Sequence, residues 1–283
     1  MLQTATTIQE IRSTVRAWKQ QGLTVGLVPT MGYLHAGHES LVKAAVASCD
    51  RVVASVFVNP TQFGPNEDLA TYPRDFAHDC QVLEKAGCHL VFHPEPSEMY
   101  PEGFCTYVEN LSAMPQQLCG KTRPIHFRGV CTVVCKLFNI VQPDKAFFGQ
   151  KDAQQLAIIK RMVKDLSLDI EIVGCPIVRE SDGLAKSSRN VYLNQSERQA
   201  ALVLSQAVRL GQELIAAGEK DCATILAKMC QVIESTPIAR IDYVAAVDGQ
   251  TMLPLETVTP GMLFAMAVYI GKTRLIDNFS VAN

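Results

Sequence analysis

Short apolar runs alternate with stretches of helical periodicity through the first part of the chain. The apolar runs predict strands at 23–28, 51–58, 88–93, 146–149 and 169–174. The periodic stretches predict helices at 7–20, 37–48, 73–86, 127–141 and 152–165. Because alternating strands and helices form parallel sheets, we expect an α/β fold with one parallel sheet and helices on both of its faces.

The pattern changes near Val178. Helices are predicted at about 196–217 and 219–234, and strands near 239–247 and 262–270. This order is typical of a smaller α+β domain. We therefore expect two domains, residues 1–177 and residues 178–283, with the second acting as a lid joined through the segment 180–183.

Polar loops follow several of the predicted strands. Four of them carry side chains suited to chemistry: Pro29–His38, Asn59–Gly64, Gly149–Asp152 and Arg179–Arg189. Ligands of parallel α/β sheets bind outside the carboxyl ends of the strands. We therefore expect these loops to converge on one ligand site.

The loop Pro29–His38 carries the most specific pattern. It places two glycines and two histidines between an apolar strand and a helix. His35 and His38 are three residues apart, so they share a face at the helix start, where backbone N–H groups attract phosphate. The pattern predicts a site for a nucleoside triphosphate. Two solvated histidines or a zinc site are the alternatives, although zinc needs further ligands that the local spacing does not provide.

Other polar residues near this edge leave two interpretations open. Gln62 has the donor and acceptors to bind a small hydroxy acid, although its segment also fits an ordinary turn. Arg128, near the start of a predicted helix, could bind a carboxylate or phosphate or form a structural ion pair. Asp79 and Glu84 could face a metal ion, but a solvated helix face is the preferred interpretation.

Two later segments suit phosphate binding. Lys151 and Asp152 occupy a strand-to-helix junction, where Asp152 fits a helix N-cap and Gln155 lies one turn further on. The segment 186–189 combines Lys-Ser-Ser-Arg, and its hydroxyl and guanidinium groups could clamp a phosphate. A serine pair also begins loops that have no function.

Composition narrows the classes of function. The net charge is −2 and no basic block is present, so nucleic acid is not an expected partner. No apolar run reaches the length of a membrane span, and the first residues lack the features of a signal peptide, so no membrane partner is expected. Ten cysteines without a Cys-x-x-Cys pair fit a reducing cytoplasm, which is the predicted location.

Six segments carry a family resemblance. They are Pro29–His38, Phe57–Gly64, Tyr72–Arg74, His126–Val130, Phe148–Asp152 and Asp182–Asn190. In this order they resemble the pantoate–β-alanine ligase family, over essentially the whole chain. The first segment is similar to the HIGH signature of the nucleotidyltransferase superfamily, and the last is similar to its KMSKS signature. The resemblance implies a Rossmann-like parallel sheet followed by a smaller C-terminal α+β domain.

The resemblance also implies a reaction. Pantoate would attack the α-phosphorus of ATP to give pantoyl adenylate and pyrophosphate, with Mg²⁺ bridging the phosphates. β-Alanine would then attack the adenylate to give pantothenate and AMP. The expected partners are therefore pantoate, β-alanine and ATP, together with a second copy of the chain, because the family is typically homodimeric through its N-terminal domain.

Residue roles follow from the same resemblance. It implies His38 as the catalytic proton donor, and it implies that phosphate charge is stabilised by His35, Lys151, Ser187, Ser188 and Arg189. The ATP contacts carry over to Met31, Gly32, Tyr33, Leu34, His35, Ala36, Gly37, His38, Gly149, Gln150, Lys151, Asp152, Val178, Lys186, Ser187, Ser188 and Arg189. Gln62 and Gln155 would bind pantoate, and Gln62 would also reach β-alanine. No protein ligand to a metal is assigned.

The chain departs from the family pattern at Lys186, Gln150 and His78. Two other functions are weighed against the ligase. A nucleotidyltransferase that attaches AMP or CMP to a phosphorylated acceptor would not explain the segment Asn59–Gly64 or a separate C-terminal domain. A nucleotide-binding regulatory protein without catalysis would not need the histidines, the lysine and the arginine of the predicted site.

Overall fold

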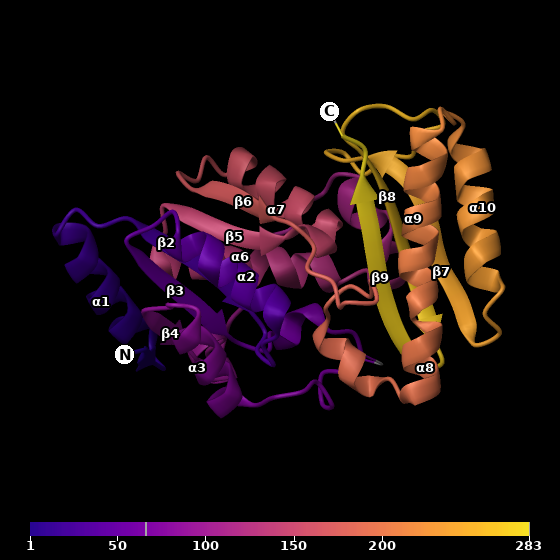
Figure 1. Cartoon of the computed structure of the whole chain (residues 1–283). Coiled ribbons are helices and arrows are strands. Elements are labelled where there is room, and N and C mark those ends of the chain that lie inside the picture. Colours follow the sequence, from indigo (N-terminus) through magenta and orange to yellow (C-terminus); the bar gives the residue numbers. More distant parts are fainter. Residues whose placement is uncertain (66, 283) are drawn as a thin grey trace. The chain divides into compact units, whose positions relative to one another are not determined.

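The computed structural model describes residues 1–65 and 67–282, which form two compact units (Figure 1). Unit 1 comprises Met1–Leu111, Arg123–Gln150 and Ile158–Pro176. Unit 2 comprises Ser112–Thr122, Lys151–Ala157 and the residues from Ile177 onward. These units are defined by packing, and the functional division between residues 177 and 178 stays a prediction.

Unit 1 is built on a sheet of six strands in the order β1-β4-β3-β2-β5-β6. All neighbouring strands in it are parallel. The strands are β1 (Gln3–Ala5), β2 (Val25–Thr30), β3 (Arg51–Val56), β4 (Leu90–Phe92), β5 (Lys145–Gly149) and β6 (Glu171–Cys175). The predicted parallel sheet is confirmed. The sequence did not reveal β1, because a strand of three residues is too short to establish a period.

Helices cover both faces of this sheet. They are α1 (Ile8–Gln20), α2 (Ala36–Val46), α3 (Phe76–Lys85), the short α4 (Pro96–Met99), α6 (His126–Val141) and α7 (Ala153–Asp165). Helix α1 packs against α6, and α2 packs against α3. The connections β1-α1-β2 and β2-α2-β3 cross the sheet in opposite directions, and such connections are right-handed. The two helix pairs therefore lie on opposite faces.

The central strands β2 and β3 lead into two of the predicted site segments. Leu27, Val28, Val52 and Val53 have no exposed surface, as expected for parallel strands covered on both faces. Strands β2 and β3 are paired along their whole length, so their carboxyl ends lie side by side. The loops that follow these two ends begin at Met31 and include Gln62, so two predicted site segments leave the sheet together.

Unit 2 is built on a three-stranded antiparallel sheet in the order β7-β8-β9. Its strands are β7 (Ala239–Asp248), β8 (Met262–Ile270) and β9 (Thr273–Ser280), and its helices are α5 (Cys119–Thr122), α8 (Gln195–Ala200), α9 (Leu202–Ala216) and α10 (Cys222–Glu234). Helices α9 and α10 pack on each other and on the outer strands. Their apolar faces and the sheet enclose one core, which includes Ile225, Met229 and Phe264. The predicted smaller α+β domain is confirmed.

Two details of unit 2 differ from the prediction. The helix predicted at 196–217 is two helices, because α8 ends at Ala200 and α9 begins at Leu202. Strand β9 was not predicted. Its buried polar residues Asp277 and Asn278 interrupt the apolar pattern that would have revealed it.

Short 3₁₀ helices carry several of the predicted site residues. They are η1 (Pro60–Gln62), η3 (Gln150–Asp152) and η4 (Ser188–Tyr192), and a further one, η2, spans Met114–Gln116. Among residues 1–65 and 67–282, no helix has the length and apolar character needed to cross a bilayer.

Candidate functional site

The histidine loop, residues Met31–His38, holds both predicted histidines at the start of α2. His35 is the N-cap, and its Nδ1 accepts a hydrogen bond from Gly37 N at 3.1 Å. His38 Nδ1 accepts one from His35 N at 3.3 Å, and the two ring centroids lie 4.1 Å apart. Because each Nδ1 is an acceptor, a neutral ring carries its proton on Nε2. Each imidazole therefore offers its N–H donor at Nε2.

Several backbone N–H groups of this loop donate to acceptors inside the protein. Gly32 N donates to Thr30 Oγ1 at 3.2 Å. Tyr33 N and Leu34 N donate to the carboxylate of Asp79 at 3.0 and 2.6 Å. Two more N–H groups donate to the imidazoles. These N–H groups are therefore engaged inside the protein, and phosphate binding at the start of α2 stays a prediction.

Asp79 lies on α3 and has 1% of its surface exposed. The prediction of a solvated helix face is wrong for this residue, because its carboxylate faces the histidine loop. Burial raises the pKa of the Asp79 carboxyl, and the N–H donors of Leu34 and Tyr33 act in the opposite direction. Sequence reasoning missed the contact because 45 residues separate Asp79 from Leu34, and no local pattern marks it.

Gln62 is buried at the end of η1. Its Oε1 accepts a hydrogen bond from Asn59 Nδ2 at 3.0 Å, and its Nε2 lies 3.1 Å from Met31 Sδ. Asn59 is held in turn by Tyr100, whose hydroxyl donates to Asn59 Oδ1 at 2.6 Å. The amide of Gln62 therefore has a defined orientation beside the histidine loop.

Helix α6 supports Gln62 from the other side. His126 Nδ1 lies 3.0 Å from Gln62 O, and Arg123 Nη1 lies 3.2 Å from His126 Nε2. A Cβ atom on Gly129 would lie 2.4 Å from Thr61 O, so only glycine allows α6 to approach η1 this closely. The close packing of α6 on η1 therefore depends on Gly129.

The predicted phosphate clamp belongs to unit 2. Ser187 is the N-cap of η4, and its hydroxyl accepts a hydrogen bond from Arg189 N at 3.3 Å. Lys186 N donates to Val178 O at 2.9 Å, and Lys186 Nζ pairs with Glu180 at 2.8 Å. Five of the residues expected to contact ATP, Val178 and Lys186–Arg189, therefore lie in one structured loop.

Strand β9 anchors this loop and one further predicted residue. Asp277 binds both Nη atoms of Arg179, at 2.7 and 2.9 Å. The next residue, Asn278, donates from Nδ2 to Lys151 O at 2.8 Å. Sequence reasoning missed both β9 residues because it missed the strand.

The other predicted residues divide between the units. Gly149 and Gln150 belong to unit 1, whereas Lys151, Asp152 and Gln155 belong to unit 2. Lys151 Nζ lies 3.9 Å from Asp152 Oδ1. Gln155 is half-buried on α7.

A metal centre was one alternative for the histidines. Within residues 1–65 and 67–282, no three His, Cys, Asp or Glu side chains gather so that they could hold a metal ion. In this part of the chain, the His35 and His38 pair therefore lacks the further ligands that zinc requires.

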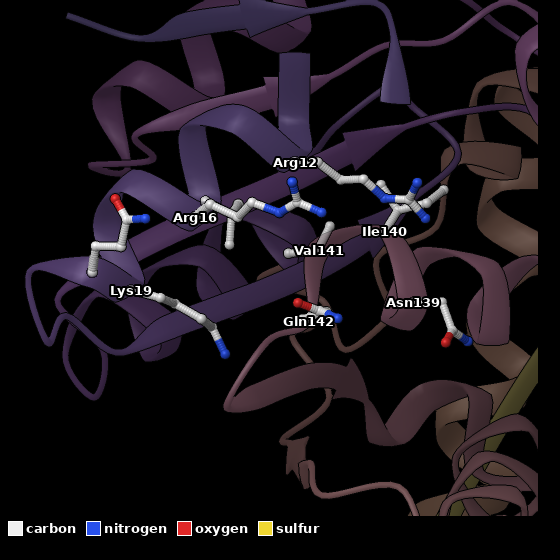
Figure 2. A pocket seen from close by; sticks show the side chains of 9 residues that line it. Arg12, Arg16, Lys19, Asn139, Ile140, Val141 and Gln142 are labelled. Carbon is white, nitrogen blue, oxygen red and sulfur yellow. The ribbon is translucent and has the colours of Figure 1, made fainter. Parts of the chain in front are cut away.

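A hollow of about 600 Å³ on unit 1 lies between α1 and the end of α6 (Figure 2). Helix α1 lines it with Arg12, Arg16 and Lys19, which recur on one face of the helix. The carboxyl end of a helix carries negative partial charge, which cations stabilise. The three cationic side chains of α1 therefore complement the carboxyl end of α6, where Val141 and Gln142 line the hollow. None of the predicted site residues lines it.

Comparisons with known proteins identify the family of the chain. A family model described as pantoate-beta-alanine ligase matches residues 3–280. A pantothenate synthetase of Ruminiclostridium cellulolyticum is 58% identical over 279 residues, which is 99% of each chain. One of Enterococcus faecalis is 54% identical over 274 residues, which is 97% of each chain.

Solved structures give the same result. The pantothenate synthetase of Thermus thermophilus matches with a TM-score of 0.95 and 45% identity, covering 99% of this chain and 100% of that chain. A pantoate–β-alanine ligase of Francisella tularensis, solved as a complex with beta-gamma ATP and β-alanine, matches with a TM-score of 0.81 and 34% identity, covering 99% and 98%. The chain belongs to the pantoate–β-alanine ligase family.

Proposed function

We propose that this chain condenses (R)-pantoate with β-alanine at the expense of ATP, giving pantothenate, AMP and pyrophosphate through a pantoyl adenylate. The observation that carries the proposal is the fixed amide of Gln62 beside the histidine loop, in a chain that belongs to this family over its length. The nucleotide and β-alanine in the F. tularensis complex support these two substrates, and the family name implies pantoate.

In the first step, a carboxylate oxygen of pantoate attacks the α-phosphorus of ATP. The bond from that phosphorus to the bridging oxygen of pyrophosphate breaks, and negative charge grows on the leaving group. Preorganised donors stabilise such charge in the transition state. We assign Nε2–H of His38 as the proton donor and His35 as a second donor, because the Nδ1 acceptors fix both rings with Nε2 as the donor atom.

The second group of phosphate ligands comes from unit 2. We propose that Lys151, Ser187, Ser188 and Arg189 contact the phosphates, while Gly149, Gln150, Asp152, Val178 and Lys186 complete the ATP site. The hydrogen bond between Lys186 and Val178 supports this assignment, since it holds two of the assigned residues together. Residues 178–283 would act as the lid, and closure would protect the adenylate from water.

In the second step, the amine of β-alanine attacks the acyl carbon of the adenylate. The bond between that carbon and the phosphate oxygen breaks, AMP leaves, and the amine loses a proton. Gln62 and Gln155 would hold the pantoyl group, and Gln62 would also reach β-alanine. A glutamine amide suits this role because it donates to and accepts from hydroxyl and carboxylate groups.

Mg²⁺ would enter with ATP as the metal–nucleotide substrate. Mg²⁺ commonly keeps several waters and binds phosphate oxygens, so it needs few protein ligands. This role is compatible with residues 1–65 and 67–282, which hold no group of three candidate ligands.

We also propose that the chain is a homodimer through its N-terminal part and works in the cytoplasm. Two large apolar side chains of unit 1, Tyr107 and Leu111, are 44% and 84% exposed, and a partner surface would cover such groups. The ten cysteines are all free, which fits a reducing compartment. Light scattering after gel filtration should give twice the chain mass, and a monomer would contradict the dimer.

The function is tested by omitting each substrate in turn. Pantothenate and AMP should form only when MgATP, pantoate and β-alanine are all present, as identified by mass. Exchange of labelled pyrophosphate into ATP should require pantoate but not β-alanine. A stable nucleotidylated product would instead indicate a nucleotidyltransferase, and ATP binding without any exchange would indicate a regulatory protein.

A further inference from the structure

The buried carboxylate of Asp79 holds the backbone of the histidine loop in an unusual conformation. Gly32 has φ of 83° and Tyr33 has φ of 51°, so two successive residues are left-handed. This region disfavours a residue with a Cβ atom, so Tyr33 needs support from outside the loop. The N–H group of Tyr33, within this turn, and that of Leu34, directly after it, both donate to Asp79.

Successive N–H groups that converge in this way form a concavity that binds anions. In this protein the anion is the side chain of Asp79, so the two N–H groups are directed toward α3. A Cβ atom on Gly32 would lie 3.0 Å from Asp79 Oδ2 and 3.0 Å from Val56 Cγ1. The carboxylate therefore fills the concavity closely.

The backbone held by Asp79 also carries the two imidazoles. Leu34 directly precedes the N-cap His35, and it is held at both ends of its backbone: its N–H donates to Asp79, and its carbonyl oxygen lies 3.2 Å from His78 Nε2. His35 N in turn donates to His38 Nδ1. The chain of contacts thus runs from α3 through Leu34 to both rings.

We infer that Asp79 is a positioning residue for adenylate formation, which sets the direction of the His35 and His38 rings through the backbone of Tyr33 and Leu34. The inference rests on the proposed role of the histidine loop in binding ATP. It gives Asp79 a function in the reaction without contact with the substrate.

The test is Asp79→Asn, which keeps the size of the side chain but turns one acceptor into a donor that faces a backbone N–H. We expect the KM for ATP to rise and pyrophosphate exchange to fall, each by on the order of tenfold or more, because a buried N–H loses its charged acceptor. The KM for β-alanine should stay within about twofold of the wild-type value, since the loss is specific to the ATP loop.

Asp75→Asn is the matched control. It removes the same charge from the N-cap of the same helix, where Asp75 accepts a hydrogen bond from His78 N. Asparagine is as good an N-cap, so we expect unchanged kinetics. An equal loss in both variants would overturn the inference, as would an unchanged KM for ATP in Asp79→Asn. Equal increases in the KM values for ATP and β-alanine would also overturn it, because they would indicate a general structural role.

Wild-type protein gives a second test that does not depend on folding of the variant. The amide hydrogens of Tyr33 and Leu34 should be strongly protected from exchange without ATP, because both donate to a buried carboxylate. Exchange at the rate of an open loop would overturn the inference. Failure of the proposed function is recognised separately, since wild-type enzyme would then form no pantothenate.

Discussion

At the scale of single residues, the two imidazoles of the histidine loop are oriented by the backbone that carries them. His35 caps α2 with Nδ1, and His38 accepts the N–H of His35 with its own Nδ1. This reciprocal arrangement fixes the tautomer of each neutral ring. The backbone of this loop therefore places the N–H of each neutral imidazole on Nε2.

Replacing His38 with alanine should impair adenylate formation. We expect pyrophosphate exchange to fall roughly 10²- to 10⁴-fold, the range for loss of a positioned proton donor. His35→Asn is a useful companion, because asparagine still caps α2 and only the imidazole is lost. An exchange rate unchanged in a normally folded His38→Ala variant would refute the assigned role.

Replacing Gln62 with alanine should act on pantoate more than on ATP. The lost amide hydrogen bonds predict a rise in the KM for pantoate of roughly three- to tenfold, from the usual worth of neutral hydrogen bonds. The KM for ATP should change less, because among the described residues the side chain of Gln62 has its hydrogen-bonding contact with the histidine loop at Met31 Sδ. Steady-state kinetics with each substrate varied in turn provide the measurement, and equal effects on both would argue against the assignment.

Some of these residues could be predicted from the sequence, and others could not because their contacts are with residues far away in the chain. His35, His38 and Gln62 lie in loops that follow apolar strands, so local patterns pointed to them. Asp79 and Asn278 act on residues far away in the sequence, and only the folded chain brings them there. Local patterns reveal chemistry in a loop, but they do not reveal what holds that loop.

At the scale of elements, strand β9 links the loop 178–189 of unit 2 to the core of that unit. Arg179 at the base of the loop binds Asp277, whose side chain is 1% exposed. The hydrogen bonds to Asp277 raise the pKa of the Arg179 guanidinium. The Asp277 carboxylate is buried too deeply for water to solvate it. Its negative charge therefore depends on Arg179.

Arg179→Met should therefore destabilise the protein. Removal of one partner from a buried ion pair costs about 3 kcal/mol or more. Arg198→Met is the matched control, since Arg198 pairs with Asp182, which is 38% exposed, and such pairs are worth about 1 kcal/mol or less. Urea denaturation of both variants measures the difference. Equal losses of free energy of unfolding would contradict this account of β9.

The packing of α6 on η1 gives a second prediction about elements. Gly129→Ala would place a Cβ atom 2.4 Å from Thr61 O, so η1 must move. We expect a loss of about 1–3 kcal/mol in the free energy of unfolding, typical of overpacking, together with a higher KM for pantoate. A variant with unchanged stability and kinetics would show that Gly129 does not position Gln62.

Elements with a clear period were predictable, and the others were not. The central strands β2 and β3 are continuous apolar runs, and α1 and α6 have apolar stripes. No regular spacing of apolar residues can be recognised in β1, because it has three residues. None can be recognised in β9, because it buries polar side chains. Buried polar groups that form hydrogen bonds with distant partners look like exposed residues in the sequence. Strands that contain them are therefore missed when strands are predicted from the apolar pattern alone.

At the scale of the whole molecule, the assigned residues belong to two units. The histidine loop and Gln62 belong to unit 1, whereas Lys151 and the loop 178–189 belong to unit 2. We propose that ATP requires both sets of donors. A reaction that forms a reactive acyl adenylate gains from such a division, because closure of one part over another excludes water.

The most direct test of the account follows the oxygen atoms of pantoate. Pantoate labelled with ¹⁸O in its carboxylate is turned over with MgATP and β-alanine, and the AMP is analysed by mass. Attack of the carboxylate on the α-phosphorus predicts that each AMP carries one ¹⁸O atom in its phosphate. Unlabelled AMP, with the ¹⁸O atom lost from the carboxylate found in pyrophosphate or in water, would contradict an adenylate intermediate and with it the central claim.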